Sequence, residues 1–228
     1  MLHEFAHDIW LADGPEIIGA VGFAFPTRMA VIRTDRGLLI WSPIAPDDAL
    51  MAQIAELGEV GFLLAPNTLH VTYLAQWAAA YPKAQIVGAP GVAAKCPDLP
   101  VTELSGASFG GWGPCLSHQL IHGNAIVLEA VLFHHASGTV IFTDLLQNMP
   151  KGWYKGWRAV VARLDKMVGM EPAVPRKFRM AFTDRNVARC DMSAVLSWPI
   201  QRVVMAHGTP VEADGGAFLR RAFSWLLR

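Results

Sequence analysis

Short apolar runs separated by turn residues fill the first ninety residues and predict a series of strands. The predicted strands cover residues 9–12, 29–33, 38–41, 60–65 and 85–88. Thr34–Gly37 lies between the second and third of these runs and ends in a glycine, which suits a hairpin turn. The run at 60–65 is almost wholly apolar, as a strand covered on both faces requires. The beginning of the chain therefore combines antiparallel hairpins with buried single strands.

Apolar positions that recur every three or four residues predict the helices. One helix begins after Asp47 or Asp48 and ends at Gly58, and another runs from Thr68 to about Ala80 with Asn67 as its cap. Further helices are expected at 157–168, 184–196 and 218–226, with strands at 119–122, 130–134, 139–143 and 203–206. Strands and helices do not simply alternate, so we expect two mixed sheets packed face to face with helices outside. One domain over residues 1–228 accommodates this order.

The composition excludes several classes of protein. Apolar residues make up 53% of the chain and charged residues 17%, which excludes disorder as the main state. Nineteen basic residues balance nineteen acidic ones, so no overall field favours nucleic acid as a partner. Three widely spaced cysteines exclude a disulfide scaffold. No uninterrupted apolar run reaches the roughly 20 residues of a membrane span, and no signal peptide is apparent. We therefore expect a cytoplasmic protein.

Polar residues follow several predicted strands directly. Asn67 and His70 follow the strand at 60–65, Asn124 follows the strand that ends near His122, and two more polar residues, Asp144 and His207, follow later strands. Such residues commonly converge on one crevice, because the carboxyl ends of strands gather at one edge of a sheet. The alternative is that Asn67 and Asp144 cap helices and that His207 begins a turn.

These positions resemble the metallo-β-lactamase superfamily over nearly the whole chain, in a branch whose metal motif is altered. The superfamily's first motif, HxHxDH after a strand, is matched by Thr68–Tyr73, where only His70 remains. Gly123-Asn124 stands where the next histidine would follow a glycine. Asp144 matches the bridging aspartate, and His207 matches the histidine of the final His-Gly motif. The resemblance implies an α/β fold, the metallo-β-lactamase-like αββα four-layer sandwich.

The altered motif also sets expectations about chemistry. The remaining ligands, His70, Asp144 and His207, imply either one zinc or iron ion with an open water position, or no metal at all. Asn67, Asn124 and Glu129 are candidates to add a weak ligand or to hold the water. The resemblance places Thr72 where the family has the aspartate that orients the attacking water, and a threonine is a poor proton acceptor.

A basic, aromatic stretch follows Asp144. Residues 151–189 contain ten lysines and arginines and three acidic residues, a net charge of +7. Trp153, Lys155 and Arg158 combine aromatic and cationic groups suited to a small anionic substrate. The alternatives are a surface helix packed on the sheet with solvated charges, and a lid or homodimer surface beside the crevice.

Two functions follow from these observations. The first is a divergent metal-dependent hydrolase that acts on a small anionic substrate. The second is a non-catalytic module that binds a small molecule or docks a partner protein, because a fold does not by itself define an activity.

Overall fold

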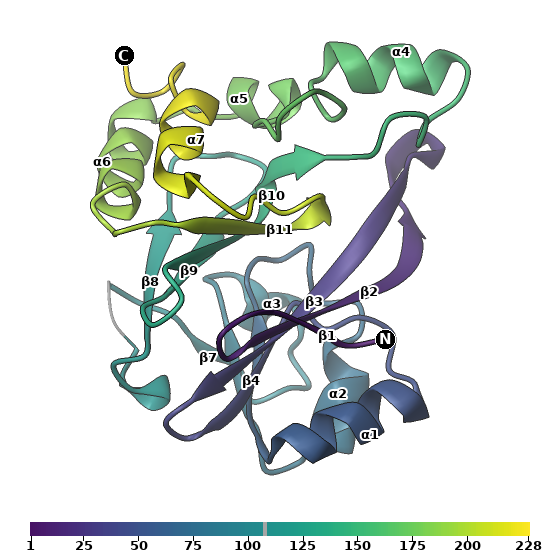
Figure 1. Cartoon of the computed structure of the whole chain (residues 1–228), viewed down its shortest axis with the longest axis vertical. Helices are drawn as coiled ribbons and strands as arrows, with labels where there is room; N and C mark the ends of the chain where they lie inside the picture. Colours follow the sequence, from purple (N-terminus) through teal and green to yellow (C-terminus); the bar gives the residue numbers. More distant parts are fainter. Residues whose placement is uncertain (107–108) are drawn as a thin grey trace.

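The computed structural model describes residues 1–106 and 109–228, and its first sheet has seven strands in chain order (Figure 1). The strands are β1 (His3–Ala6), β2 (Ile9–Ile18), β3 (Ala24–Thr34), β4 (Gly37–Trp41), β5 (Val60–Ala65), β6 (Gln85–Gly88) and β7 (Thr102–Glu103). Strands β1 to β4 are antiparallel, and β4 to β7 are parallel. Gly37 has a φ of 105°, which lets the chain turn between β3 and β4.

Helices provide the crossovers that parallel strands require. These are α1 (Asp48–Leu57), α2 (Leu74–Ala80) and the short α3 (Val92–Lys95). The predicted ends of α1 are confirmed, because the Asp47 side chain accepts a hydrogen bond from the backbone N–H of Leu50 and Gly58 ends the helix. The predicted bounds of β5 and β6 are also confirmed.

The second sheet has four strands in the order β11-β10-β9-β8. They are β8 (Leu116–Ile121), β9 (Glu129–His134), β10 (Thr139–Asn148) and β11 (Arg202–Gly208). Strands β8, β9 and β10 are antiparallel, whereas β11 is parallel to β10. The remaining helices are α4 (Trp157–Leu164), α5 (Arg176–Met180), α6 (Arg185–Val195) and α7 (Gly215–Ala222), and two 3₁₀ turns are η1 (Ala20–Gly22) and η2 (Gly110–Trp112).

Alternation along the strands divides the core into layers. Leu39 and Trp41 of β4 face the second sheet, whereas Leu38 and Ile40 face the helices α1 and α2. In β10, Ile141 belongs to the core between the sheets, and its neighbours pack on α6 and α7. The two sheets therefore form the inner layers and the helices the outer layers (Figure 1), which confirms the expected αββα arrangement.

Three predicted helices differ from the structure. The last helix, expected at 218–226, is α7, which begins at Gly215 and ends at Ala222. The helix expected from Thr68 begins only at Leu74, because the Asn67 side chain closes a turn by accepting from the backbone N–H of Leu69. The helix expected to reach Val168 ends at Leu164, because Lys166 has a φ of 63°, in the left-handed region. Within the described residues, no helix is long and apolar enough to cross a bilayer.

Candidate metal centre

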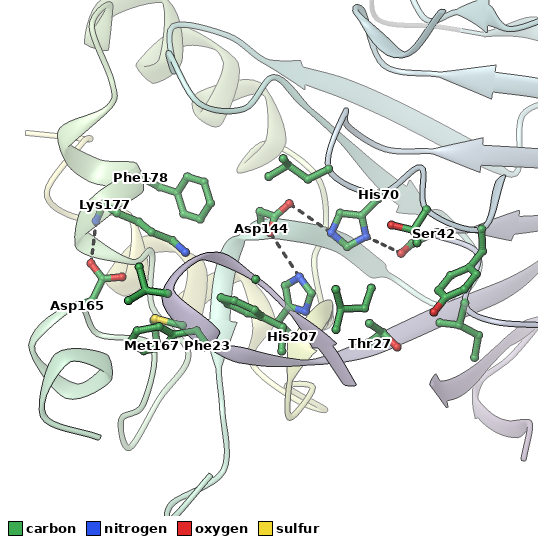
Figure 2. Close-up of a pocket in the computed structure, with 18 of the residues that line it drawn as sticks. Phe23, Thr27, Ser42, His70, Asp144, Asp165, Met167, Lys177, Phe178 and His207 are labelled. Carbon is green, nitrogen blue, oxygen red and sulfur yellow. Dashed lines mark hydrogen bonds and ion pairs between the residues drawn. The ribbon is translucent and has the colours of Figure 1, made fainter. Parts of the chain in front are cut away.

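Three side chains from different elements meet where the two sheets adjoin (Figure 2). His70 lies in the turn after β5, Asp144 lies in β10 and His207 lies in β11. The pairing of β10 with β11 shifts between Phe142 and Gln147, so the strand leaves the ladder around Asp144. One donor atom from each of the three side chains lies within 4.8 Å of the others. The structure therefore brings the three candidate ligands together.

The carboxylate of Asp144 lies between the two imidazoles. His70 Nε2 is 3.3 Å from Asp144 Oδ2, and His207 Nε2 is 3.4 Å from Asp144 Oδ1. The two histidine rings are 5.3 Å apart between centroids. Burial opposes ionisation of Asp144, but the two histidines hold the pKa of its carboxyl well below the usual range. Asp144 therefore offers an anionic oxygen as a candidate ligand.

Each histidine is oriented by a partner on the first sheet. His207 Nδ1 lies 2.7 Å from the carbonyl oxygen of Pro26, and because a carbonyl only accepts, Nδ1 donates to it while Nε2 faces Asp144. His70 Nδ1 lies 2.8 Å from Ser42 Oγ. Ser42 is buried and has a φ of 52°, an unusual conformation for a residue other than glycine. Such outer partners are typical of metal-binding histidines.

Asp144 is held in turn by two buried polar residues. Asn67 Nδ2 donates to Asp144 Oδ2 at 2.9 Å. Glu129 is wholly buried, and its carboxylate accepts the backbone N–H groups of Thr143, Asp144 and Leu145 at 2.6, 2.8 and 3.0 Å. Burial, reinforced by the charge of Asp144, raises the pKa of Glu129 to about 7. Asn67 and Glu129 therefore hold Asp144 in position.

The donor set fits a zinc or iron ion. Ligand atoms about 2.0–2.2 Å from a tetrahedral zinc ion lie about 3.3–3.6 Å from each other. Each histidine nitrogen lies at about this spacing from one Asp144 oxygen, at 3.3 Å from Oδ2 for His70 and at 3.4 Å from Oδ1 for His207. Two imidazole nitrogens and one carboxylate are also the ligand types of non-haem iron sites.

A cavity of about 620 Å³ opens over the three ligands (Figure 2). Its polar lining includes Thr27, Ser42, Asp165 and Lys177 besides the three candidate ligands. The other walls are mainly apolar: Ile17, Phe23, Phe25, Ile44, Leu69, Val161, Met167 and Phe178. Thr72 and Tyr73, from the altered first motif, also line it. A ligand in this cavity would meet a large apolar surface with polar groups confined to a few places.

Two of the other predicted site residues lie behind or beside the ligands. Asn67 is buried against Asp144, and Glu129 is buried beneath the backbone of β10. Asn124 lies elsewhere: its amide donates to the carbonyl of Phe178, and its oxygen accepts from Ile126 and Val127. The contacts of Asn124 therefore attach the loop before β9 to α5.

The predicted substrate-binding residues lie on the segment that borders the cavity. Trp153 Nε1 donates to the carbonyl of Ala24 at 2.9 Å, and the Arg158 guanidinium donates to the carbonyl of Val21. These contacts fasten the segment to the tip of the β2–β3 hairpin, whereas Lys155 is exposed. Among the described residues that line the cavity, the lysine is Lys177 of α5, which is itself exposed and which the sequence did not distinguish from the other basic residues of 151–189.

Comparison with known proteins identifies the fold. No family model matches the chain, and no curated protein matches it. Among solved structures, a metallo-beta-lactamase from Pontibacter korlensis superposes with a TM-score of 0.65 at 13% identity, over 99% of this chain and 98% of that one. The metallo-beta-lactamase FIM-1 from Pseudomonas aeruginosa, in its mono-zinc form, gives a TM-score of 0.62 at 12% identity, over 100% and 92%.

A third structure extends the likeness beyond the lactamases. The metal-soaked flavodiiron core Flv1 from Synechocystis sp. PCC6803 gives a TM-score of 0.65 at 12% identity, over 99% of this chain and 60% of that one. At these identities the likeness shows the fold alone. The chain has the metallo-β-lactamase fold, as its resemblance to the superfamily implied.

Proposed function

We propose that this protein is a single-metal hydrolase for small amphipathic substrates. The observation that supports the proposal is the meeting of His70, Asp144 and His207 at the floor of a largely apolar cavity. A zinc or iron ion held by these three side chains would lower the pKa of bound water and polarise the substrate. The chain's own residues would position the three metal ligands and bind the substrate.

The contacts around the site assign a separate role to each group of residues. Asn67 and Glu129 hold Asp144 in place, and Ser42 and the carbonyl of Pro26 orient the two histidines. The apolar walls exclude water from the body of a substrate. Lys177 places its ammonium 5.1 Å from the Phe25 ring centroid and 5.0 Å from that of Phe178. A single negative charge on the substrate would bind there.

The test is metal content followed by activity. Protein purified without added metal is analysed for zinc and iron, and then screened against esters and phosphodiesters that carry an apolar group. We expect about one ion per chain and hydrolysis that a chelator abolishes. The His207→Asn variant should lose both. A metal-free parent protein that takes up neither zinc nor iron would contradict the proposal.

A non-catalytic binding module is the second candidate, and one observation favours it. Both oxygens of Asp144 already face partners, with Asn67 and His70 on one and His207 on the other. This arrangement neutralises the carboxylate without an ion. In that case a chelator would leave the binding of an amphipathic carboxylate unchanged, while Lys177→Ala would weaken it.

A further inference from the structure

The apolar stripe of α4 faces solvent. Trp157, Val160, Val161 and Leu164 follow the spacing i, i+3, i+4, i+7, which places them on one face of the helix. Their exposed fractions are 52%, 60%, 41% and 60%. In an ordinary surface helix this stripe would pack on the core. In α4 the buried residue is Ala162, which lies on the side of the helix opposite the stripe.

The tip of the β2–β3 hairpin extends the same apolar surface. Ile18 and Val21 are exposed by 67% and 72%, and Arg158 joins the tip to α4 through the carbonyl of Val21. The ring centroids of Phe23 and Trp157 are 5.8 Å apart. Figure 1 shows the far end of the hairpin reaching toward α4. We call Ile18, Val21, Trp157, Val160, Val161 and Leu164 the apolar rim.

The rim borders the mouth of the cavity. Val21 and Val161 belong both to the rim and to the cavity lining, and the exposed Leu69 lines the cavity as well. An apolar molecule that crossed the rim into the cavity would therefore contact mainly apolar surface until it reached His70, Asp144 and His207.

Basic residues outnumber acidic ones around the rim, where Asp165 follows Leu164 and the exposed Glu16 lies two residues before Ile18. Arg158 and Arg163 lie on opposite sides of the α4 stripe, since they precede and follow its centre around the helix. Lys151 and Lys155 are exposed just before α4, and Lys166 is exposed just after it. An apolar face flanked by basic side chains that reach past it is typical of helices that lie in a membrane interface. The cytoplasmic face of membranes carries negative charge that attracts such groups.

We propose that the apolar rim docks this protein onto an anionic lipid bilayer, with the cavity mouth turned toward the lipid. The charge pattern favours a bilayer over a second copy of the chain, because two copies would bring the basic residues of both rims together. The rim inserts its apolar side chains to the level of the headgroups, and the flanking lysines and arginines contact lipid phosphates. The proposal does not require a bound metal.

The experiment is vesicle sedimentation with the full-length protein, with and without chelator. One set of vesicles contains phosphatidylcholine alone, and the other replaces about a third of it with phosphatidylglycerol. We expect binding to the anionic vesicles that weakens several-fold as salt rises from about 0.1 to 0.5 M, because the attraction is screened. The double variant Val160→Ser/Leu164→Ser should lower the partition coefficient about tenfold or more. Val187→Ser, an exposed valine on α6, is the matched control and should bind like the parent.

A second pair of variants tests the charges. Lys155→Ala/Arg163→Ala should weaken binding at low salt and flatten the salt dependence, whereas the exposed pair Lys83→Ala/Lys95→Ala should do neither. Absence of parent binding to anionic vesicles would overturn the proposal. So would binding that the rim variant leaves intact. A dimer that light scattering detects in the parent and not in Val160→Ser/Leu164→Ser, without vesicle binding, would assign the rim to a second copy instead.

Discussion

The buried carboxylate of Glu129 accepts a hydrogen bond from the backbone N–H of Asp144, with 2.8 Å between donor and acceptor. The same carboxylate accepts from Thr143 and Leu145, on either side of Asp144. This stretch of β10 has left its ladder with β11, so its amides need another acceptor. Glu129 of β9 thereby holds the backbone segment that carries Asp144, the central candidate ligand.

We expect Glu129→Gln to lower the free energy of unfolding by about 3 kcal/mol. The amide keeps one acceptor oxygen and turns an NH₂ group toward backbone donors, which leaves buried groups unpaired. Urea unfolding measures the change. Glu103→Gln is the matched control, because Glu103 also accepts two backbone N–H groups, those of Gly91 and Ala93, but is exposed. Its cost should stay below about 1 kcal/mol, and equal costs for both variants would contradict the role assigned to Glu129.

Ser42→Ala should weaken zinc binding about tenfold, because His70 loses the partner that orients its ring. Competition with a chromophoric chelator measures the affinity. Ser117→Ala is the control: Ser117 Oγ lies 2.8 Å from His135 Nε2, the same kind of contact on an exposed histidine away from the ligands. If the two variants bind zinc equally well, Ser42 does not orient a ligand.

The altered first motif can be tested by restoring it. The triple variant Thr68→His/Thr72→Asp/Tyr73→His should raise the number of zinc ions bound per chain above that of the parent. Thr72 and Tyr73 already line the cavity that contains the candidate ligands. Elemental analysis gives the stoichiometry. An unchanged value would mean that this turn does not correspond to the family motif.

The buried His134 should contribute to acid sensitivity. Burial lowers the pKa of its imidazole. Below about pH 6.5 the unfolded chain therefore binds a proton that the folded chain does not, and the unfolding free energy contributed by His134 falls as the pH decreases below that value. Glu129 acts in the opposite direction, because its pKa of about 7 makes its contribution fall as the pH rises from about 4.5 to 7.

The two effects are separated by comparing variants. His134→Asn should show a smaller loss of stability between about pH 7 and 5 than the parent, by urea unfolding at each pH. An identical pH dependence of His134→Asn and the parent would show that His134 does not titrate in this range.

The sequence by itself determined the elements whose signals are local. Val60–Ala65 is a strand because its run is apolar and short, and α1 has the ends that Asp47 and Gly58 specify. The sequence also indicated His70, Asp144 and His207 as a group, because each follows an apolar strand and matches the remainder of a family motif. Propensity, capping and strand ends depend on neighbours along the chain, which is why these features could be predicted.

Only the tertiary structure decided what surrounds those residues. Ser42 and the carbonyl of Pro26 contact the histidines across 28 and 181 positions of the chain, separations that no local pattern encodes. Lys177 lines the cavity because of how α5 packs, while Lys155, equally basic in sequence, stays outside. The periodicity of α4 predicted an apolar stripe but not that it would face solvent, because the exposure of a helix face depends on which elements the fold places against it.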